Sequence, residues 1–373
     1  MRIVQANKAY LPHIGGIETV VRHIAEGLST RQHESAVIAC SDDKKTHRMN
    51  SNGVEVTYAA TLTRLSSLPI SPTYGRHLMQ QTADVLLVHE PFLLGGLTYL
   101  SNRPLARRHF KRLIVWWHSD IIRQKTLKPF YEPLLNKLLD TADAIIVATP
   151  KHISSSQYLP QYAAKCHVVP YGIEQERFTE TPELQECTRQ MLARFTKPII
   201  LFSGRLVYYK GVEYLIRAMA KVPDAHLVIV GNGPLANALQ ELAAVSSPDI
   251  TFIPYLDDNE LNAMYKACAM LVLPSVENSE AFGLVQIEAM ANGKPVISTD
   301  LETGVTYVNR HQETGLVVPR RDSDALACAI NLLLSRPDLC VSLGTFAQAR
   351  VLKEFTVESM LDQLERLFGE MLA

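Results

Sequence analysis

The stretch that decides the fold is 199–220, which reads IILFSGRLVYYKGVEYLIRAMA. The almost wholly apolar run 199–203 is typical of a parallel strand that helices cover on both faces. A loop containing Gly204 and Gly211 follows. Residues 212–220 then carry apolar side chains at the spacing of an amphipathic helix. The stretch therefore predicts one strand–loop–helix repeat of an α/β protein.

The same alternation runs along the chain, except between Tyr171 and Pro198, where Gly172, Pro182 and an acidic stretch interrupt it. The predicted strands are 2–5, 35–39, 85–89, 113–118, 144–148 and 167–170 before this interruption, and 199–203, 226–230, 250–253, 270–274, 295–298 and 315–318 after it. We expect two doubly wound Rossmann-like domains, 1–173 and 174–353, with a cleft between them, followed by an amphipathic helix over 354–373.

Composition places the chain among globular proteins. Its 373 residues are 47% hydrophobic and 20% charged, which excludes disordered, collagenous and coiled-coil classes. The net charge of −1 hides an asymmetry: the balance is +7 over 1–175 and −8 over 176–373. Two parts of opposite charge are expected to meet different partners. Aromatic–basic platforms typical of nucleic-acid binding are not apparent, so no nucleic acid is expected as a partner.

Other bulk features indicate a cytoplasmic protein. No apolar run approaches the length that spans a bilayer, and the N-terminus leads into a strand pattern instead of a signal peptide. The cysteines are scattered without a C-x-x-C pair, so we expect reduced, small core residues and no zinc site. They are Cys40, Cys166, Cys187, Cys268, Cys328 and Cys340.

Three loops carry the candidate chemistry. The first, 10–18, follows the first strand and holds Gly15 and Gly16, which let a backbone approach an anionic ligand at a helix N-terminus. A plain strand–helix turn is the alternative. The spacing is not G-x-G-x-x-G, so a nicotinamide dinucleotide is not favoured.

The second loop, 203–211, offers Arg205 as a fork for phosphate oxygens and Lys210 as a point charge. Together they are expected to neutralise a diphosphate, including the charge that develops as it leaves. Two solvated surface cations are the alternative.

The third loop leads from Pro274 into a helix expected to begin near Gly283. Carboxylates suit sugar hydroxyls, and the loop provides Glu280 before the helix and Glu288 inside it. The helix N-terminus is a natural phosphate seat. A capping Glu280 with an incidental Glu288 is the alternative.

These loops together resemble the retaining GT-B glycosyltransferases of the GT4 family. The spacing of Glu280 and Glu288 matches that family's E-x7-E motif, and further matching pieces occur in the family's order up to about residue 334. They include 15–16, 203–205, 210–211, 231–234, 274–275, 282–284, 288–291, 293–296 and 314–319.

The resemblance implies a donor site for a nucleoside diphosphate sugar. Gly15 and Gly16 would pack against the diphosphate, which Arg205 and Lys210 would bind, and Glu280 would hold hydroxyls of the donor sugar. Glu288 would hold the ribose. Tyr255 and Leu256 would line the base site. The other implied donor contacts are Asn232 and the amides of Phe282, Gly283 and Leu284.

The resemblance also places His118 beside the reacting sugar, with Asp120 as a group that orients it. Without the resemblance, a buried histidine with a purely structural role is an alternative for His118. Tyr10 and His13 would lie on the acceptor side. The helix over 354–373 would cross back to the first domain, and closure of the domains would exclude water.

Two departures from the family pattern bear on the donor sugar and on metal binding. The family's usual Gly-Gly-x-x-Glu stretch is replaced here by 300–307, DLETGVTY, which looks like a subset acting in O-antigen and polysaccharide assembly with GDP-mannose or GDP-rhamnose. Mannose or rhamnose and GDP over UDP are therefore favoured. The second departure, Asp322-Ser323-Asp324, formally matches a metal motif, but its position predicts an N-cap. Transfer without a metal or other cofactor is expected.

The implied reaction is hexosyl transfer with retention, by front-face attack in which the leaving diphosphate takes the acceptor proton. The acceptor, a saccharide or a lipid-linked saccharide, is expected on the basic first domain. A basic run there, which contains Arg103, Arg107, Arg108, Lys111 and Arg112, predicts contact with the anionic inner face of the cytoplasmic membrane. A solvated helix face is the alternative.

Two other functions remain open from the sequence. A non-hydrolysing nucleotide-sugar epimerase shares the two-domain architecture, although the Glu280 and Glu288 spacing favours transfer. A non-catalytic sugar-nucleotide-binding protein would bind a donor without turnover.

Overall fold

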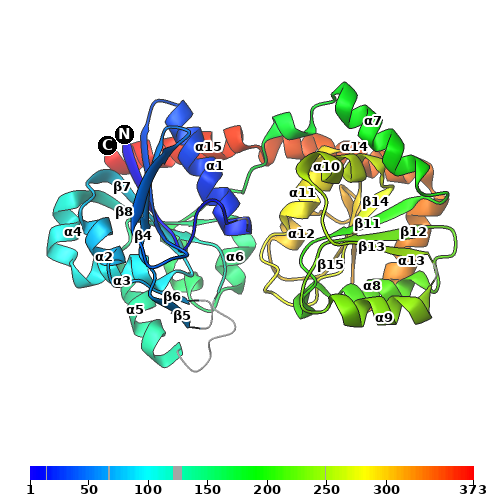
Figure 1. Ribbon diagram of the computed structural model, residues 1–373, viewed down its shortest axis with the longest axis horizontal. Helices are drawn as coiled ribbons and strands as arrows, with labels where there is room; N and C mark the ends of the chain where they lie inside the picture. Colours follow the sequence, from blue (N-terminus) through cyan, green and yellow to red (C-terminus); the bar gives the residue numbers. More distant parts are fainter. Residues whose placement is uncertain (14, 66–67, 121–127, 248) are drawn as a thin grey trace. The chain divides into compact units, whose positions relative to one another are not determined.

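The computed structural model describes residues 1–13, 15–65, 68–120, 128–247 and 249–373. The chain divides into two compact units. Unit 1 comprises Met1–Gly172 and Val357–Ala373, and unit 2 comprises Ile173–Thr356. Each unit has its own sheet with helices on both faces (Figure 1), so the predicted α/β class with Rossmann-like architecture is confirmed.

The sheet of unit 1 is parallel except at one edge. Its strands in spatial order are β10 (Cys166–Val168), β9 (Ala144–Val147), β8 (Phe110–Trp117), β7 (Ala83–Glu90), β1 (Arg2–Ala6), β2 (Glu34–Cys40), β4 (Val54–Ala59) and β3 (His47–Ser51). In register, Ile3 of β1 lies opposite Ser35 of β2 and Val85 of β7. The edge strand β3 is antiparallel to β4. A separate antiparallel pair joins β5 (Thr63–Leu65) to β6 (Leu68–Ile70).

Alternate residues of these strands pack against two helix layers. Ala36 and Ile38 belong to one buried cluster, which includes residues of α2 (Tyr74–Met79), α3 (Leu93–Ser101) and α5 (Lys128–Thr141). Val37 and Ala39 belong to another, which includes residues of α1 (Gly16–Thr30). The other described helices of Met1–Gly172 are α4 (Arg103–His109), α6 (Pro150–Ser155) and η1 (Leu159–Lys165).

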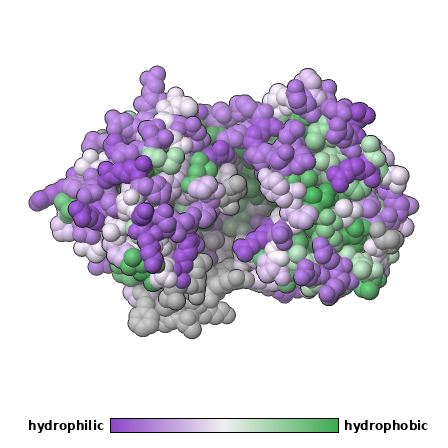
Figure 2. Space-filling model, in the orientation of Figure 1, coloured by the Kyte–Doolittle hydropathy of each residue, from purple (hydrophilic) through white to green (hydrophobic). Residues whose placement is uncertain are grey.

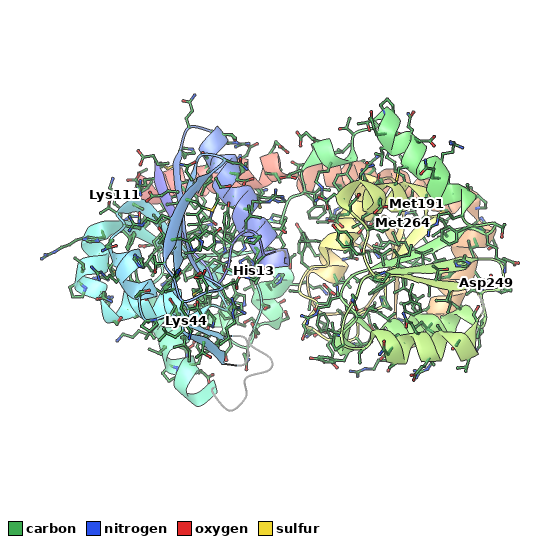
Figure 3. The ribbon with its side chains drawn as sticks, in the orientation of Figure 1. His13, Lys44, Lys111, Met191, Asp249 and Met264 are labelled. Atoms are coloured by element: carbon green, nitrogen blue, oxygen red, sulfur yellow. The ribbon has the colours of Figure 1, made fainter. Side chains whose placement is uncertain are left out.

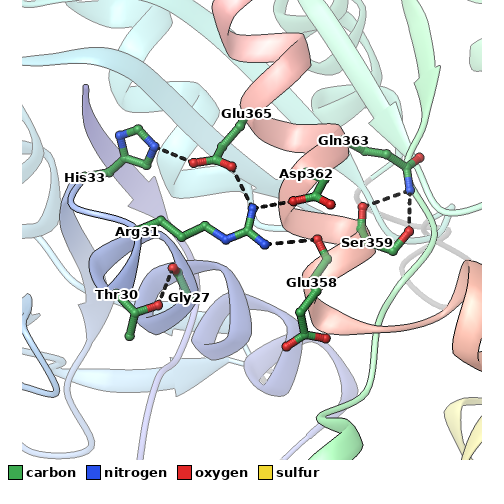
Figure 4. Close-up of polar contacts among 9 residues, drawn as sticks. All are labelled: Gly27, Thr30, Arg31, His33, Glu358, Ser359, Asp362, Gln363 and Glu365. Carbon is green, nitrogen blue, oxygen red and sulfur yellow. Dashed lines mark hydrogen bonds and ion pairs between the residues drawn. The ribbon is translucent and has the colours of Figure 1, made fainter.

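The last helix, α15 (Val357–Leu372), packs against α1 within unit 1. Its buried residues follow helical spacing, and a polar cluster fixes its register (Figure 4). Arg31 donates to Asp362 and to Glu365, each at 2.6 Å, and His33 contacts Glu365 at 2.7 Å. Although partial burial raises the pKa of Glu365, the hydrogen bonds from His33 and Arg31 outweigh it and hold that pKa below its ordinary value. The carboxylate therefore stays charged and anchors α15.

The sheet of unit 2 is parallel throughout. Its strands in spatial order are β13 (Ile250–Ile253), β12 (His226–Val230), β11 (Ile199–Ser203), β14 (Met270–Leu273), β15 (Val296–Thr299) and β16 (Gly315–Val318). All except β13, whose residues are partly exposed, are largely buried, as the apolar runs predict. One helix layer contains α8 (Val212–Met219), α9 (Ala236–Ser246) and α13 (Ser323–Ser335). The other contains α7 (Pro182–Ala193), α10 (Asp258–Ala267), α11 (Leu284–Ala291) and α14 (Pro337–Glu354).

Two local predictions have opposite outcomes. Asp322 is the N-cap of α13 and accepts hydrogen bonds from the amides of Asp324 and Ala325 at 3.0 and 2.9 Å, so the capping interpretation is confirmed. The expectation that the cysteines are core residues is wrong for Cys328, which is exposed on the outer face of α13. All six cysteines are free.

No single described helix is long and apolar enough to cross a membrane. The helices α13 and α14 satisfy such a test only as a pair, with a bend of 100° between them. The face seen in Figure 2 is mainly hydrophilic, with apolar side chains scattered among polar ones.

Candidate active site

The site residues of unit 2 gather at the carboxyl edge of its sheet. The strand order reverses at β11, because β12 pairs on one side of it and β14 on the other. Loops after β11 and β14 therefore diverge at a topological switch point, where open α/β sheets bind ligands. The loop after β11 carries Arg205 and Lys210, and the loop after β14 carries Glu280.

A buried ion pair joins these two loops. The Lys210 Nζ lies 2.5 Å from the Oε2 of Glu280, and the two side chains are only 10% and 9% exposed. The Ser275 hydroxyl donates to the same carboxylate at 3.1 Å. A cation and a carboxylate are thus held together beside the switch point, each neutralising the other at low dielectric. The sequence predicted both residues in the site, but not their direct contact.

Backbone approaches that only glycine permits bring the loops together. Gly211 adopts φ +61°, and a Cβ there would lie 2.3 Å from the carbonyl oxygen of Pro274. The amide of Val276 also donates to the carbonyl of Tyr209 at 2.8 Å. Gly231, after β12, adopts φ +135°, and a Cβ there would lie 2.0 Å from the carbonyl oxygen of Gly204. These contacts fix the loop backbone under Arg205 and Lys210.

Other predicted donor contacts occupy the same edge, and all of these except Leu256 are open to solvent. Arg205 is exposed. Asn232 follows β12, and its side-chain oxygen accepts a hydrogen bond from the amide of Gly233 at 2.7 Å. Tyr255 and Leu256 follow β13; the Tyr255 ring is 78% exposed, whereas Leu256 is buried. An exposed aromatic ring at a strand end is available to stack on a planar ligand group.

The third loop leads into α11 as predicted. Gly283 is its N-cap at φ +75°, Leu284 is its first residue, and Phe282 is buried just before it. The preceding backbone is fixed, because Thr303 Oγ1 donates to the carbonyl of Glu280 and the amide of Gly304 donates to Ala281, both at 2.8 Å. The first amides of a helix have no partner within it and are oriented toward anions.

Glu288 lies within α11, where its carboxylate accepts a hydrogen bond from the Tyr265 hydroxyl at 2.7 Å. Burial raises the pKa of Glu288, and that hydrogen bond partly opposes the shift. Sequence reasoning missed Tyr265, which comes from α10 and has no motif around it. The pairing agrees with the view that Glu288 is not an incidental surface acid.

In unit 1 the strand order reverses between β1 and β7. The glycine loop follows β1: Gly15 is the N-cap of α1 and Gly16 is its first residue. A Cβ on Gly15 would lie 2.4 Å from a carboxylate oxygen of Glu18. An acid therefore lies against the position that an anionic ligand was expected to take, and a diphosphate there would have to displace the Glu18 side chain.

A chain of buried hydrogen bonds crosses the strand ends of unit 1. The Gln5 amide donates to the carbonyl of Val21 at 3.1 Å, which turns its oxygen toward His89 Nε2 at 2.8 Å. His89 Nδ1 lies 2.9 Å from His118 Nε2, and His118 Nδ1 lies 2.6 Å from the Tyr171 hydroxyl. Burial lowers the pKa of both histidines, that of His89 to about 3.

The orientation of Gln5 assigns the protons along this chain. His89 donates from Nε2 to Gln5, so its Nδ1 accepts from His118 Nε2; His118 Nδ1 then accepts from the Tyr171 hydroxyl. Both nitrogens of neutral His118 are thus engaged, and its side chain is buried. Sequence reasoning missed His89 and Tyr171, although the predicted strands 85–89 and 113–118 end at His89 and His118.

The expected pairing of Asp120 with His118 is wrong, because each side chain has other partners. The Asp120 carboxylate instead accepts hydrogen bonds from Trp117 Nε1 at 3.1 Å, from the Ser156 hydroxyl at 2.7 Å and from the Gln157 amide at 3.0 Å. These local donors satisfy the carboxylate, whereas a buried neutral histidine gains more from the neutral Tyr171 hydroxyl. Asp120 therefore joins the end of β8 to the residues that follow α6.

Glu90, at the end of β7, is a buried acid that no motif indicated. It accepts a hydrogen bond from the Tyr131 hydroxyl at 2.6 Å. Burial raises its pKa to about 7, against the opposing effects of Tyr131 and the Phe92 amide. The folded state therefore holds this proton at pH values where an unfolded chain has lost it, and its stability falls as the pH rises from about 4.5 to 7.

Glu90→Gln is expected to stabilise the protein by about 2–3 kcal/mol more at pH 8 than at pH 5, because glutamine never ionises in the buried site. Urea unfolding of the variant and the wild type at both pH values measures this difference. The exposed Glu183→Gln serves as the control. An equal effect of Glu90→Gln at the two pH values would show that Glu90 does not titrate in this range.

The basic run is only partly free. Lys111 forms an ion pair with Asp84 at 2.7 Å, and Arg112 donates to the carbonyl of Met371 in α15. Arg107 and Arg108 are exposed on α4. Tyr10 is fully buried, whereas His13 forms an exposed ion pair with Asp42. Among the described residues, no group of three or more His, Cys, Asp or Glu side chains has an arrangement that would hold a metal ion.

Comparison with known proteins agrees with this architecture. The family profile "Glycosyltransferase Family 4" matches residues 14–177, and "Glycosyl transferases group 1" matches residues 186–350. The chain is 31% identical to the O-antigen chain mannosyltransferase C of Escherichia coli, covering 100% of this chain and 99% of that protein. It is 32% identical to the D-rhamnosyltransferase WbpZ of Pseudomonas aeruginosa, covering 95% and 92%.

Solved structures show the same fold. A sucrose-phosphate synthase from Thermosynechococcus elongatus superposes with a TM-score of 0.79 at 23% identity, covering 99% of this chain and 98% of that one. HepE of Anabaena in complex with UDP-glucose also gives 0.79, at 19% identity, covering 99% and 100%. The full-length relatives and the two matching profiles lead to one conclusion: the chain belongs to glycosyltransferase family 4, and it is a hexose-transferring enzyme with the GT-B fold.

Proposed function

We propose that the protein is a retaining, metal-independent hexosyltransferase that moves mannose or rhamnose from a GDP-sugar to a saccharide or lipid-linked acceptor in O-antigen-like polysaccharide synthesis. The observation that carries the site assignment is the buried pair of Lys210 and Glu280 beside the switch point of unit 2. The two relatives matched over nearly their full length are a mannosyltransferase and a rhamnosyltransferase, which supports the choice of sugar.

Unit 2 is proposed to bind the donor. Arg205 and Lys210 neutralise the diphosphate together with the amides of Phe282, Gly283 and Leu284 at the start of α11. Hydroxyls of the sugar donate to Glu280 and those of the ribose to Glu288. Tyr255, Leu256 and Asn232 line the base and its surroundings.

In the transfer step the bond from the anomeric carbon to the diphosphate oxygen breaks and the bond to the acceptor oxygen forms on the same face. The acceptor proton passes to the departing diphosphate. Negative charge grows on the leaving group, so the fixed cations of unit 2 stabilise the transition state more than the ground state.

Unit 1 is proposed to bind the acceptor, with His13 and His118 on its ligand-facing edge; Tyr10, which is fully buried, is not part of that edge. Because both ring nitrogens of His118 are engaged, its role is to position the reacting groups rather than to remove a proton. Asp120 supports the loop that presents it.

A donor screen tests the proposal. GDP at about 100 times its Kd should stabilise the protein by about 2.7 kcal/mol and raise its Tm, whereas UDP at the same concentration should shift it less. A UDP shift equal to or larger than that of GDP would contradict the GDP assignment. The absence of a shift with either nucleotide would contradict the donor site itself.

We also propose that α4 brings unit 1 to the inner face of the cytoplasmic membrane. Arg107 and Arg108 are exposed on this helix, and Leu105, about one turn before Arg108, is 42% exposed, so α4 presents cations and an apolar side chain to solvent. Each cation near an anionic leaflet contributes about 1 kcal/mol, screened by salt. Flotation with anionic vesicles at low salt should carry the protein upward, and Arg107→Glu with Arg108→Glu should abolish this; no flotation of the wild type would contradict it.

A further inference from the structure

A small cavity opens at the carboxyl edge of unit 1, and His118 and its hydrogen-bond partners do not line it. Its volume is about 140 Å³. Its walls come from the loop after β1, the loop after β2 and the β3–β4 hairpin; Figure 3 labels His13 and Lys44 on the first two. The lining residues that matter for its chemistry are His13, Asp42, Asp43, His47, Met49 and Tyr58.

The walls are held in place by contacts between these three segments. The Tyr58 hydroxyl donates to the carbonyl of Leu11 at 2.6 Å, which joins β4 to the loop after β1. The ring of His47 stacks on the ring of Tyr58, with centroids 4.6 Å apart and planes 17° from parallel. The cavity walls are therefore fixed by contacts within the protein itself.

The acids of the cavity are fixed in orientation. Asp43 Oδ1 accepts from the Ser41 hydroxyl at 2.9 Å and from the Lys45 amide at 2.8 Å, and the backbone carbonyl of Asp43 accepts from the Thr61 amide. The hydrogen bonds from Lys45 and Ser41 hold the pKa of Asp43 below its ordinary value. Asp42 binds His13 at 2.6 Å and Arg64 at 2.7 Å. Within the described chain, Asp43 Oδ2 has no protein donor and can accept from a ligand.

This combination selects one class of ligand. Asp42 is paired with Arg64, but Asp43 Oδ2 has no protein donor within the described chain, so the cavity disfavours phosphate and other anions. The free carboxylate oxygen, beside apolar lining residues such as Leu11 and Met49, favours a ligand that combines hydrogen-bond donors with apolar groups over a wholly apolar acyl chain. A carboxylate can accept from two adjacent hydroxyls, while stacked rings and the Met49 side chain offer apolar contact to C–H groups. A sugar ring combines adjacent hydroxyls with a C–H face.

We infer that this cavity binds one sugar ring of the saccharide acceptor, with Asp43 accepting its hydroxyls and the face formed by His47 and Met49 contacting its C–H groups. The acceptor role rests on the proposed function; sugar binding in the cavity does not. The inference identifies the loop after β2 and the β3–β4 hairpin as determinants of acceptor specificity, which no sequence motif indicated.

Methyl-¹³C-methionine NMR tests the inference on the full chain. Met49 lines the cavity and its resonance is assigned with Met49→Leu. Titration with methyl α-mannoside, α-rhamnoside, α-glucoside, α-galactoside and N-acetyl-α-glucosaminide should shift the Met49 resonance saturably with at least one of them. Asp43→Asn keeps an oxygen for the Ser41 and Lys45 contacts but replaces the ligand-facing acceptor with a donor, so the Kd should rise at least tenfold.

Two controls separate this inference from the proposed function. Asp224→Asn, an exposed acid in unit 2, should leave the Met49 titration unchanged. Failure of all five glycosides to shift Met49, or an unchanged Kd in Asp43→Asn, would overturn the inference. GDP-induced stabilisation measured on the same samples reports the donor site independently, so a missing Met49 shift with intact GDP binding contradicts only the cavity assignment.

Discussion

Lys210→Ala is expected to lower the free energy of unfolding by about 3–5 kcal/mol and to reduce hexosyl transfer at least 100-fold. The loss of stability follows because Glu280 would remain buried without its partner at 2.5 Å. The loss of turnover follows because the cation that stabilises the leaving diphosphate is removed. Urea unfolding and initial rates at a temperature where the variant is folded measure the two effects.

A double variant separates the two consequences. Lys210→Met combined with Glu280→Gln leaves no unpaired charge, so stability should recover by several kcal/mol while transfer stays low. The matched control is Lys221→Ala, which removes an exposed ion pair with Asp324 and should cost less than about 1 kcal/mol. Transfer by the double variant within threefold of the wild type would contradict the proposed role of the pair.

Gly231→Ala is expected to destabilise the protein by about 3 kcal/mol or more and to weaken nucleotide binding. Its φ of +135° is unfavourable for alanine, and the new Cβ would lie 2.0 Å from the carbonyl oxygen of Gly204. The backbone of the loop that carries Arg205 must then move. Urea unfolding gives the first effect, and the GDP-dependent Tm shift gives the second.

Gly369→Ala provides the control for this substitution. Gly369 lies in α15, and a Cβ there would meet nothing within 4 Å. Alanine should therefore stabilise the helix by about 0.5–1 kcal/mol. If Gly231→Ala were as well tolerated as Gly369→Ala, the close approach of the two loops would not be needed for the donor site.

The twelve predicted strands all form, and most of them are apolar runs that are buried between helix layers, whereas β10 and β13 are only partly buried. The strands β4, β5 and β6 were not predicted, and neither was β3 (His47–Ser51). Its residues HRMNS are mostly exposed and show no apolar alternation, so pairing with β4 at the sheet edge, not local pattern, makes it a strand. That unpredicted strand contributes His47 and Met49 to the proposed sugar-binding cavity.

The sequence predicted several site residues individually, but it did not predict which of them are in contact. Lys210 and Glu280 lie 70 positions apart, and their pairing depends on β11 and β14 being neighbours, which a sequence pattern does not specify. The same holds for Tyr265 beside Glu288 and for Tyr171 beside His118. Glu18 against Gly15 shows the reverse case, in which a motif predicted an open anion seat and the neighbouring side chain fills it.

The activity proposed for the protein is hexosyl transfer with retention from a nucleoside diphosphate sugar. The most direct measurement incubates the full chain with GDP-α-mannose and a mannoside acceptor and records the anomeric configuration of the product by NMR. An α-linked product, formed by the wild type and reduced at least 100-fold in Lys210→Ala, is the predicted result. A β-linked product would contradict retention, and release of free mannose alone or no turnover with GDP-mannose and GDP-rhamnose would contradict transfer from these donors.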